Sequence, residues 1–129
     1  MRTRAILENV FYHDGRGPEL QRVRWGNKGV VLRGFEYYNP DDEFTDINLK
    51  NIKILGIQVY SMTTEEVHSN ILATGESRAA IFEVLNSDWL RTYHDSHLVN
   101  CKHYQIMFYD EIYDVVCEAI ISGTGKITG

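Results

Sequence analysis

Cysteine and proline are scarce in this sequence, which contains two of each. Two cysteines cannot build the disulfide framework on which small secreted domains depend, so a hydrophobic core has to hold the fold together. A chain of 129 residues can supply that core, because a domain near this size buries roughly two-thirds of the surface that its unfolded chain exposes. We therefore expect one domain over residues 1–129.

Long apolar runs are missing as well. No run approaches the ~18–20 residues that cross a bilayer. Arg2, Arg4 and Glu8 interrupt the N-terminal stretch, where a signal peptide would place its apolar segment. These absences indicate a cytoplasmic protein with reduced thiols and no membrane partner.

Basic side chains are in the minority, and the net charge is −5. Residues 1–33 hold seven basic and three acidic side chains, a balance of +4, which leaves −9 on the rest of the chain. Nucleic acids are bound mainly through basic surface. The acidic remainder therefore argues against a nucleic-acid partner.

The sequence does contain a series of runs rich in β-branched and aromatic residues, which favour a pleated sheet, and glycine and proline breaks separate them. The expected strands are Ala5–His13, Gln21–Trp25, Val30–Tyr38, Asn51–Ser61 and Arg78–Asn86. The second and third form a hairpin, and a change of alternation near Gly56 indicates a bulge in the fourth. Ser87 suits the N-cap of a short helix over Asp88–Tyr93.

The clearest pattern is a C-terminal β-hairpin, in which His103–Tyr109 and Ile112–Ile121 flank Asp110-Glu111. A two-residue loop there would pair Tyr104 with Cys117, Ile106 with Val115 and Phe108 with Tyr113. Side chains alternate along a strand, so these six share one apolar face that another layer must cover. The opposite face is largely polar, and we expect it to be solvated, with His103 opposite Glu118.

Together these patterns predict a mainly β (β-rich α+β) domain. We expect an antiparallel two-layer sheet, sandwich-like, with one or two short helices and the C-terminal β-hairpin. The edge of that hairpin would offer unpaired backbone groups to a second copy, so a homodimer is left open.

Four side chains between residues 94 and 103 are of types that bind zinc, namely His94, His97, Cys101 and His103. Their spacing is compact enough to converge on one ion but matches no standard zinc motif. The interpretation without an ion is a polar connection between the short helix and the hairpin. A metal-dependent enzyme with zinc as its cofactor is therefore the alternative function.

A second candidate site lies where two tyrosines precede an acidic turn. The predicted binding residues are Tyr37, Tyr38, Asp41, Asp42 and Glu43. Adjacent strand residues face opposite ways, so one tyrosine should point outward unless both faces of the sheet are covered. An outward tyrosine beside carboxylates suits a basic protein partner. The carboxylates could instead coordinate calcium, but the segment lacks the ligand order and the glycine of an EF-hand.

No complete nucleophile-elbow, dinucleotide-binding or zinc-protease signature is present. We therefore expect a non-catalytic protein-binding module that uses a Tyr-rich, acidic surface. The segment Phe82–Leu90 and the hairpin that follows it resemble small bacterial proteins, some of which sit beside toxins as immunity proteins. The resemblance implies an immunity- or adaptor-like role and carries over no functional residues.

Overall fold

The computed structural model of the protein describes residues 2–6, 18–25, 33–39, 42–64, 66, 80–93 and 98–127. These residues form nine strands and one short 3-10 helix. The strands are β1 (Arg2–Ile6), β2 (Glu19–Arg24), β3 (Arg33–Tyr38), β4 (Lys50–Leu55), β5 (Val59–Thr64), β6 (Ile81–Leu85), β7 (Lys102–Met107), β8 (Glu111–Cys117) and β9 (Ala119–Thr124).

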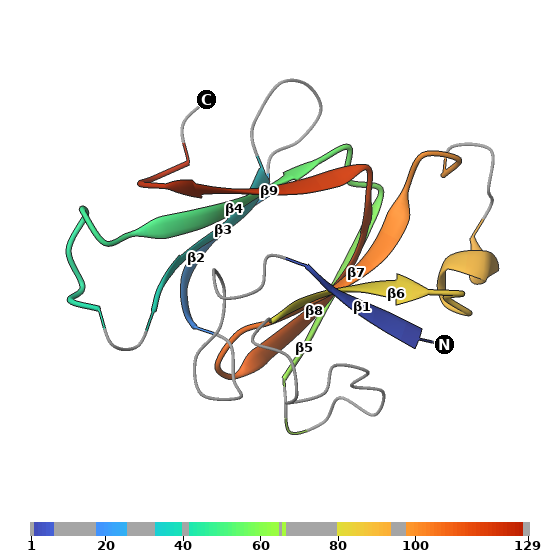
Figure 1. Cartoon of the computed structure of the whole chain (residues 1–129), viewed down its shortest axis with the longest axis horizontal. Helices are drawn as coiled ribbons and strands as arrows, with labels where there is room; N and C mark the ends of the chain where they lie inside the picture. The colour runs from blue at the N-terminus through green and yellow to red at the C-terminus, as the bar shows by residue number, and fades with distance from the viewer. Residues whose placement is uncertain are drawn as a thin grey trace.

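The strands make two antiparallel sheets that pack against each other (Figure 1). The first sheet has five strands in the order β1-β6-β7-β8-β5, and the second has four in the order β2-β3-β4-β9. This arrangement confirms the predicted mainly β, antiparallel two-layer fold. The predicted pairing of the second and third runs is also confirmed, as the hairpin of β2 and β3.

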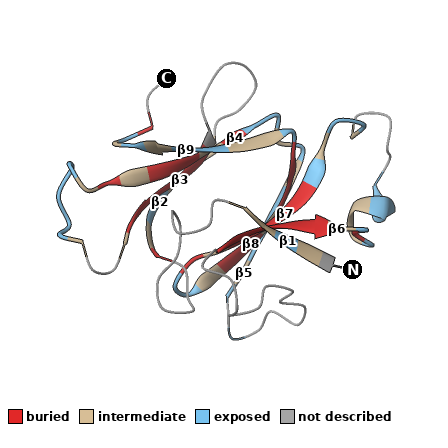
Figure 2. Ribbon diagram, viewed as in Figure 1, coloured by how far each residue is buried: buried red, intermediate tan, exposed pale blue. Residues whose placement is uncertain are grey.

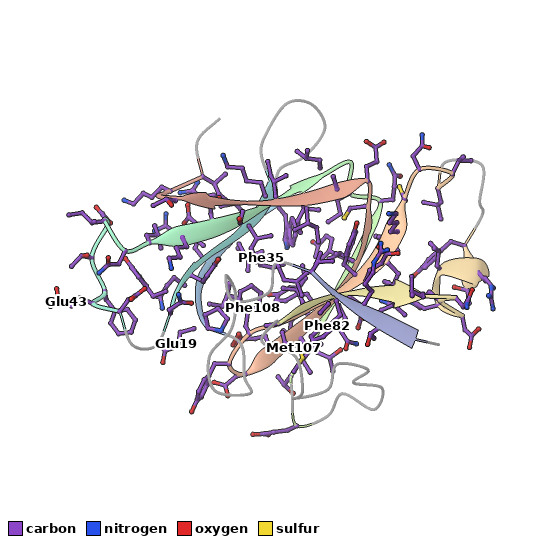
Figure 3. The ribbon with its side chains drawn as sticks, viewed as in Figure 1. Glu19, Phe35, Glu43, Phe82, Met107 and Phe108 are labelled. Carbon is purple, nitrogen blue, oxygen red and sulfur yellow. The ribbon has the colours of Figure 1, made fainter. Side chains whose placement is uncertain are left out.

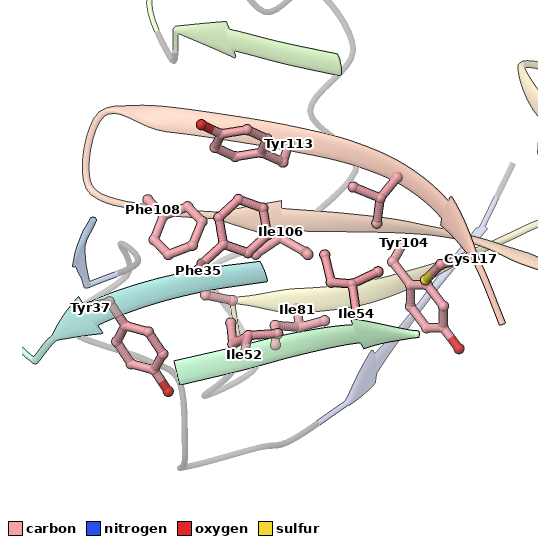
Figure 4. Packing of buried hydrophobic residues seen from close by; sticks show 12 residues of the cluster. Phe35, Tyr37, Ile52, Ile54, Ile81, Tyr104, Ile106, Phe108, Tyr113 and Cys117 are labelled. Carbon is pink, nitrogen blue, oxygen red and sulfur yellow. The ribbon is translucent and has the colours of Figure 1, made fainter. Parts of the chain in front are cut away.

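Aromatic and aliphatic side chains from both sheets fill the space between the layers, where the ribbon is mostly buried (Figure 2). Phe35 of β3 lies at the centre of this core and is fully buried. Its ring centroid is 4.9 Å from that of Phe108 and 4.6 Å from that of Tyr113, both contributed by the other sheet (Figure 4). The core also includes Tyr37, Ile52, Ile54, Ala80, Ile81, Tyr104, Ile106, Val115 and Cys117.

Two strands pass side by side from one sheet to the other. β4 continues into β5 through Gly56, and β8 continues almost directly into β9. Leu55 pairs with Ala119 before this corner, and Val59 pairs with Val116 after it. From Leu55 to Val59 the chain advances four residues, whereas the paired segment from Val116 to Ala119 advances three. The change of alternation near Gly56 does mark an extra residue, but the result is a corner between sheets and not a bulge within one continuous strand.

The C-terminal hairpin is present as β7 and β8, in a register two residues away from the predicted one. Ile106 pairs with Tyr113 and not with Val115. The N–H of Phe108 donates to the carbonyl oxygen of Glu111 at 2.7 Å, which closes the turn one residue earlier than expected. A shift by two residues keeps every side chain on its predicted face, so the apolar face is confirmed as part of the core.

The opposite face of the hairpin is not solvated, contrary to the prediction. His103 and Gln105 are only 4% and 1% exposed. His103 lies opposite Val116, and its ring contacts that of Trp89 at a centroid distance of 4.9 Å. The chain segment after β6 thus covers this polar face, and polar groups buried in this way need hydrogen-bond partners within the protein.

That covering segment holds the one helical element of the described residues, the 3-10 turn Leu90–Thr92. The N-cap of this turn is Trp89 and not the predicted Ser87, although Ser87 Oγ accepts a hydrogen bond from the N–H of Leu90 at 3.0 Å. The helix itself is shorter than predicted. Among the described residues, no helix has the length and apolar character needed to cross a membrane.

The hairpin has hydrogen-bonded neighbours on both sides, because β6 pairs with β7 and β5 pairs with β8. Its strands therefore lie inside the five-stranded sheet. The free hairpin edge on which the homodimer prediction depended does not exist in this fold.

Candidate functional site

His103, the most buried described member of the predicted zinc cluster, is enclosed by polar partners. Its Nδ1 lies 2.7 Å from Ser87 Oγ, and its Nε2 lies 2.8 Å from Asp114 Oδ1. A carboxylate can only accept, so Nε2 carries the hydrogen, and Nδ1 then accepts a hydrogen bond from the Ser87 hydroxyl. Both ring nitrogens are therefore engaged, and a metal could bind only at the expense of one of these hydrogen bonds.

The other predicted zinc ligands are not brought to His103 by the described structure. His94 and His97 lie outside the described residues. Cys101 is partly exposed just before β7. Within the described ranges, no group of three or more His, Cys, Asp or Glu side chains could hold a metal ion. The convergence of all four residues on one ion stays a prediction.

Neither cysteine has the environment of a reactive thiol. Burial raises the pKa of Cys101, and the charge of nearby Glu118 raises it further. Burial also raises the pKa of Cys117 to about 12, and this side chain is fully buried in the core. The thiolate is the nucleophilic and metal-binding form, so both side chains remain protonated and weakly reactive at neutral pH.

The two tyrosines of the predicted binding site are buried. Tyr37 is 0% exposed and belongs to the core, while Tyr38 is 9% exposed on the opposite face of β3. The ring of Phe44 covers Tyr38 in an edge-on contact at 5.0 Å. Both faces of the sheet are covered here, so the expected outward tyrosine is absent. Asp41 lies outside the described residues, whereas Asp42 is half-buried and Glu43 is exposed.

The segment that follows these tyrosines exposes two large apolar side chains. We call residues 42–48 the acidic loop, since it holds Asp42, Glu43 and Asp46 and no basic residue. Phe44 is 61% exposed and Ile47 is 85% exposed. Figure 3 shows Glu43 at the outer end of this loop, far from the core residues Phe35 and Phe108. Two large apolar side chains thus stand among three carboxylates at one end of the sandwich.

Hydrogen bonds within the acidic loop hold its shape. The N–H of Thr45 donates to the Glu43 carbonyl oxygen at 2.8 Å, and the N–H of Asn48 donates to that of Thr45 at 3.0 Å. The Asn48 side-chain amide also donates to the Glu43 carbonyl oxygen at 3.2 Å. These hydrogen bonds fix the backbone that carries the exposed side chains, which reduces the conformational entropy lost when a partner binds.

The base of the loop is tied to the body of the protein. Leu49 is 4% exposed, and its carbonyl oxygen accepts a hydrogen bond from the N–H of Gly125 at 2.7 Å. The segment after β9 is held in turn by the second sheet, because the N–H of Ile127 donates to the carboxylate of Glu36 at 2.6 Å. Asn51 Nδ2 donates to the Gly125 carbonyl oxygen at 2.6 Å. Hydrogen bonds to the segment after β9 therefore hold the base of the acidic loop in place.

The expected turn is present, but the outward apolar side chains in it are Phe44 and Ile47 and not a tyrosine. Phe44 and Ile47 were not selected, because large apolar residues are usually buried. The available signal was the placement of both among acidic residues in a segment without strand alternation. Ser87 was identified only as a helix cap, and the polar face of the hairpin was expected to be solvated, so the contacts of Ser87 and Asp114 with His103 were not foreseen.

The arrangement of these sites has to be interpreted on its own physical terms. Comparison of the chain with known protein families, curated proteins and solved structures finds no match.

Proposed function

We propose that the protein binds a basic partner protein through the acidic loop, as an immunity- or adaptor-like module of the bacterial cytoplasm. The exposure of Phe44 and Ile47, 61% and 85%, is the observation that supports this proposal most strongly. A partner that covers such side chains removes apolar surface from water, and buried aromatic and aliphatic anchors at the centre of an interface dominate binding energy.

The charge of the loop indicates the chemistry of the partner. Asp42, Glu43 and Asp46 stand beside the two apolar side chains in the loop, and Lys50 lies close, with its Nζ 4.0 Å from Asp42 Oδ2. Complementary charge accelerates association and selects among partners. The surface that fits is therefore an apolar pocket rimmed by lysine or arginine side chains. Nucleic acid offers no such pocket and carries the wrong charge.

Protein binding needs no catalytic group in the acidic loop, and the composition of the loop agrees with such a role. The phenyl ring and the aliphatic side chain can serve as apolar anchors, and the carboxylates supply charge. The predicted roles of Asp42 and Glu43 are kept in this proposal, while Phe44 and Ile47 replace the buried tyrosines as its apolar part.

The test replaces both apolar anchors with serine and measures capture of a partner by the immobilised protein. We expect Phe44→Ser combined with Ile47→Ser to weaken partner binding by at least about 30-fold, because each hot-spot side chain contributes roughly 1–2 kcal/mol. Ile121→Ser is the matched control, since Ile121 is 46% exposed on β9, away from the loop. Wild-type protein and this control should capture the same basic protein.

Salt provides a second criterion for the same interaction. Capture should weaken between about 50 mM and about 500 mM salt, because screening reduces attraction between exposed charges. A captured protein that binds the double serine variant as well as the wild type, or whose capture is unaffected by salt, would contradict the proposal. So would a second copy of this chain as the captured species.

The alternative function is a zinc enzyme built on His94, His97, Cys101 and His103. It predicts about one zinc ion per chain in protein purified without chelator. We expect elemental analysis to find much less, because both ring nitrogens of His103 are hydrogen-bonded at 2.7 and 2.8 Å and burial favours the protonated thiol of Cys101. Stoichiometric zinc that is lost in a His103→Ala variant would establish the zinc site on which this alternative depends.

A further inference from the structure

A serine, a histidine and a carboxylate form one hydrogen-bonded chain on the covered face of the first sheet. Ser87 precedes the 3-10 turn, His103 lies on β7 and Asp114 lies on the neighbouring strand β8. The two contacts of the histidine are 2.7 and 2.8 Å long. A hydroxyl in contact with a base that a third group orients is the arrangement by which enzymes activate a serine nucleophile.

The hydrogen positions implied by these contacts have the correct order for proton transfer. Asp114 fixes the hydrogen on Nε2 of His103, so the lone pair of Nδ1 points at the hydroxyl hydrogen of Ser87. The N–H of Leu90 donates to Ser87 Oγ at 3.0 Å. Ser87 therefore has its hydroxyl hydrogen directed to the base, and the N–H of Leu90 fixes the position of its oxygen.

The backbone around Ser87 presents it on a sharp turn. Asn86, the residue before it, has a φ of 55°, in the left-handed region that non-glycine residues rarely adopt. The chain thus passes from strand β6 through a tight turn into a helical segment. Asparagine adopts this region more readily than other non-glycine residues, and the turn sets the direction in which the chain leaves β6 at Ser87.

From these contacts we infer that Ser87 and His103 are catalytic residues for the hydrolysis of small acyl esters, with Asp114 as a positioning residue. This site is separate from the acidic loop and does not depend on the proposed function. Ser87 is only 4% exposed, so the acyl group has to be short, of the size of acetyl. The ring of Trp89 packs on that of His103 at a centroid distance of 4.9 Å.

The reaction balances without a cofactor. Ser87 Oγ forms a bond to the acyl carbon while the carbon–oxygen bond of the ester breaks. His103 Nδ1 takes the hydroxyl proton and delivers it to the departing alcohol. Water then attacks the acyl group, gives one proton to His103 and releases the carboxylic acid, with the hydroxyl of Ser87 restored.

The experiment compares serines within one molecule, using methanesulfonyl fluoride, a reagent close to acetyl in size, on the native protein and peptide mass spectrometry. Reaction at Ser87 forms an oxygen–sulfur bond and releases fluoride, and the proton passes to His103. Ser61 and Ser122 are exposed and serve as internal controls. We expect Ser87 to be modified at least about 100-fold faster than either, the range that a positioned base provides.

Two variants distinguish activation from a structural role. Asp114→Asn keeps the size of the side chain and should reduce modification of Ser87 by at least about 100-fold. The variant Ser87→Ala should lose hydrolysis of p-nitrophenyl acetate, whereas the control variant Ser61→Ala should retain it. Modification of buried Ser87 no faster than that of Ser61 would overturn the inference, and this comparison needs only the wild-type protein.

Discussion

Replacing Phe35 with alanine should lower the free energy of unfolding by about 3–5 kcal/mol, the range for a buried phenyl ring. Phe35 is 0% exposed, and its ring contacts Trp25, Phe108 and Tyr113 at centroid distances of 5.1, 4.9 and 4.6 Å. Alanine would leave a cavity between the two sheets, because these rings belong to different strands and cannot all move inward. Denaturant unfolding followed by tryptophan fluorescence measures the loss.

The matched control is the same substitution in the acidic loop. Phe44 is 61% exposed and contacts only one other ring within the described residues, that of Tyr38. Phe44→Ala should therefore change the free energy of unfolding by at most about 1 kcal/mol. Equal losses at positions 35 and 44 would show that Phe35 is not enclosed between two layers.

Alanine at Gly34 should be as damaging as the loss of Phe35. Gly34 has a φ of 153°, and an added Cβ would lie 1.8 Å from the carbonyl oxygen of Ile52 on the neighbouring strand. Backbone atoms of a paired strand cannot move aside as a flexible side chain can. We expect Gly34→Ala to lower the free energy of unfolding by about 4 kcal/mol, near the upper limit for single substitutions.

Gly125→Ala separates the effect of the backbone angle from that of the clash. Gly125 also has a positive φ, of 90°, but an added Cβ would meet nothing within 4 Å. Its loss should be only about 1–2 kcal/mol, which is the cost of the left-handed conformation for an L-residue. Similar thermal unfolding of the two variants would rule out the close approach of β3 and β4 at Gly34.

The face of each C-terminal strand could be predicted from sequence, while the register could not. Alternation has a period of two, so Tyr104, Ile106 and Phe108 stay on one face whether the partner strand is shifted by two residues or not. The turn decides between these registers. Glu111 joins β8, and the turn closes at Phe108 instead.

The covered polar face was hidden from sequence reasoning for a different reason. His103 is buried by Ser87 and Trp89, which precede it by 16 and 14 positions and reach it only through the fold. Short-range patterns contain no information about such contacts. A polar strand face predicts exposure unless partners are available elsewhere in the chain, and here Ser87 and Asp114 supply them.

In the acidic loop, the prediction from sequence failed in the selection of the exposed side chains. The carboxylates at positions 42 and 43 correctly indicated a turn, but the adjacent tyrosines were assumed to be its surface. Tyr37 faces the core between the sheets, and Phe44 covers Tyr38 on the opposite face of the strand. The identity of the exposed apolar residues therefore depended on the second sheet face, which no local pattern describes.

Site-specific photo-crosslinking from position 47 tests the central claim most directly. A benzophenone side chain in place of Ile47, introduced in the living cell, should form an adduct with one basic protein, whereas the same group in place of Ile121 should not. Both positions are exposed, at 85% and 46%, so the comparison isolates the loop. An absence of adducts at position 47 beyond those at position 121 would contradict the assignment of the acidic loop as the binding surface.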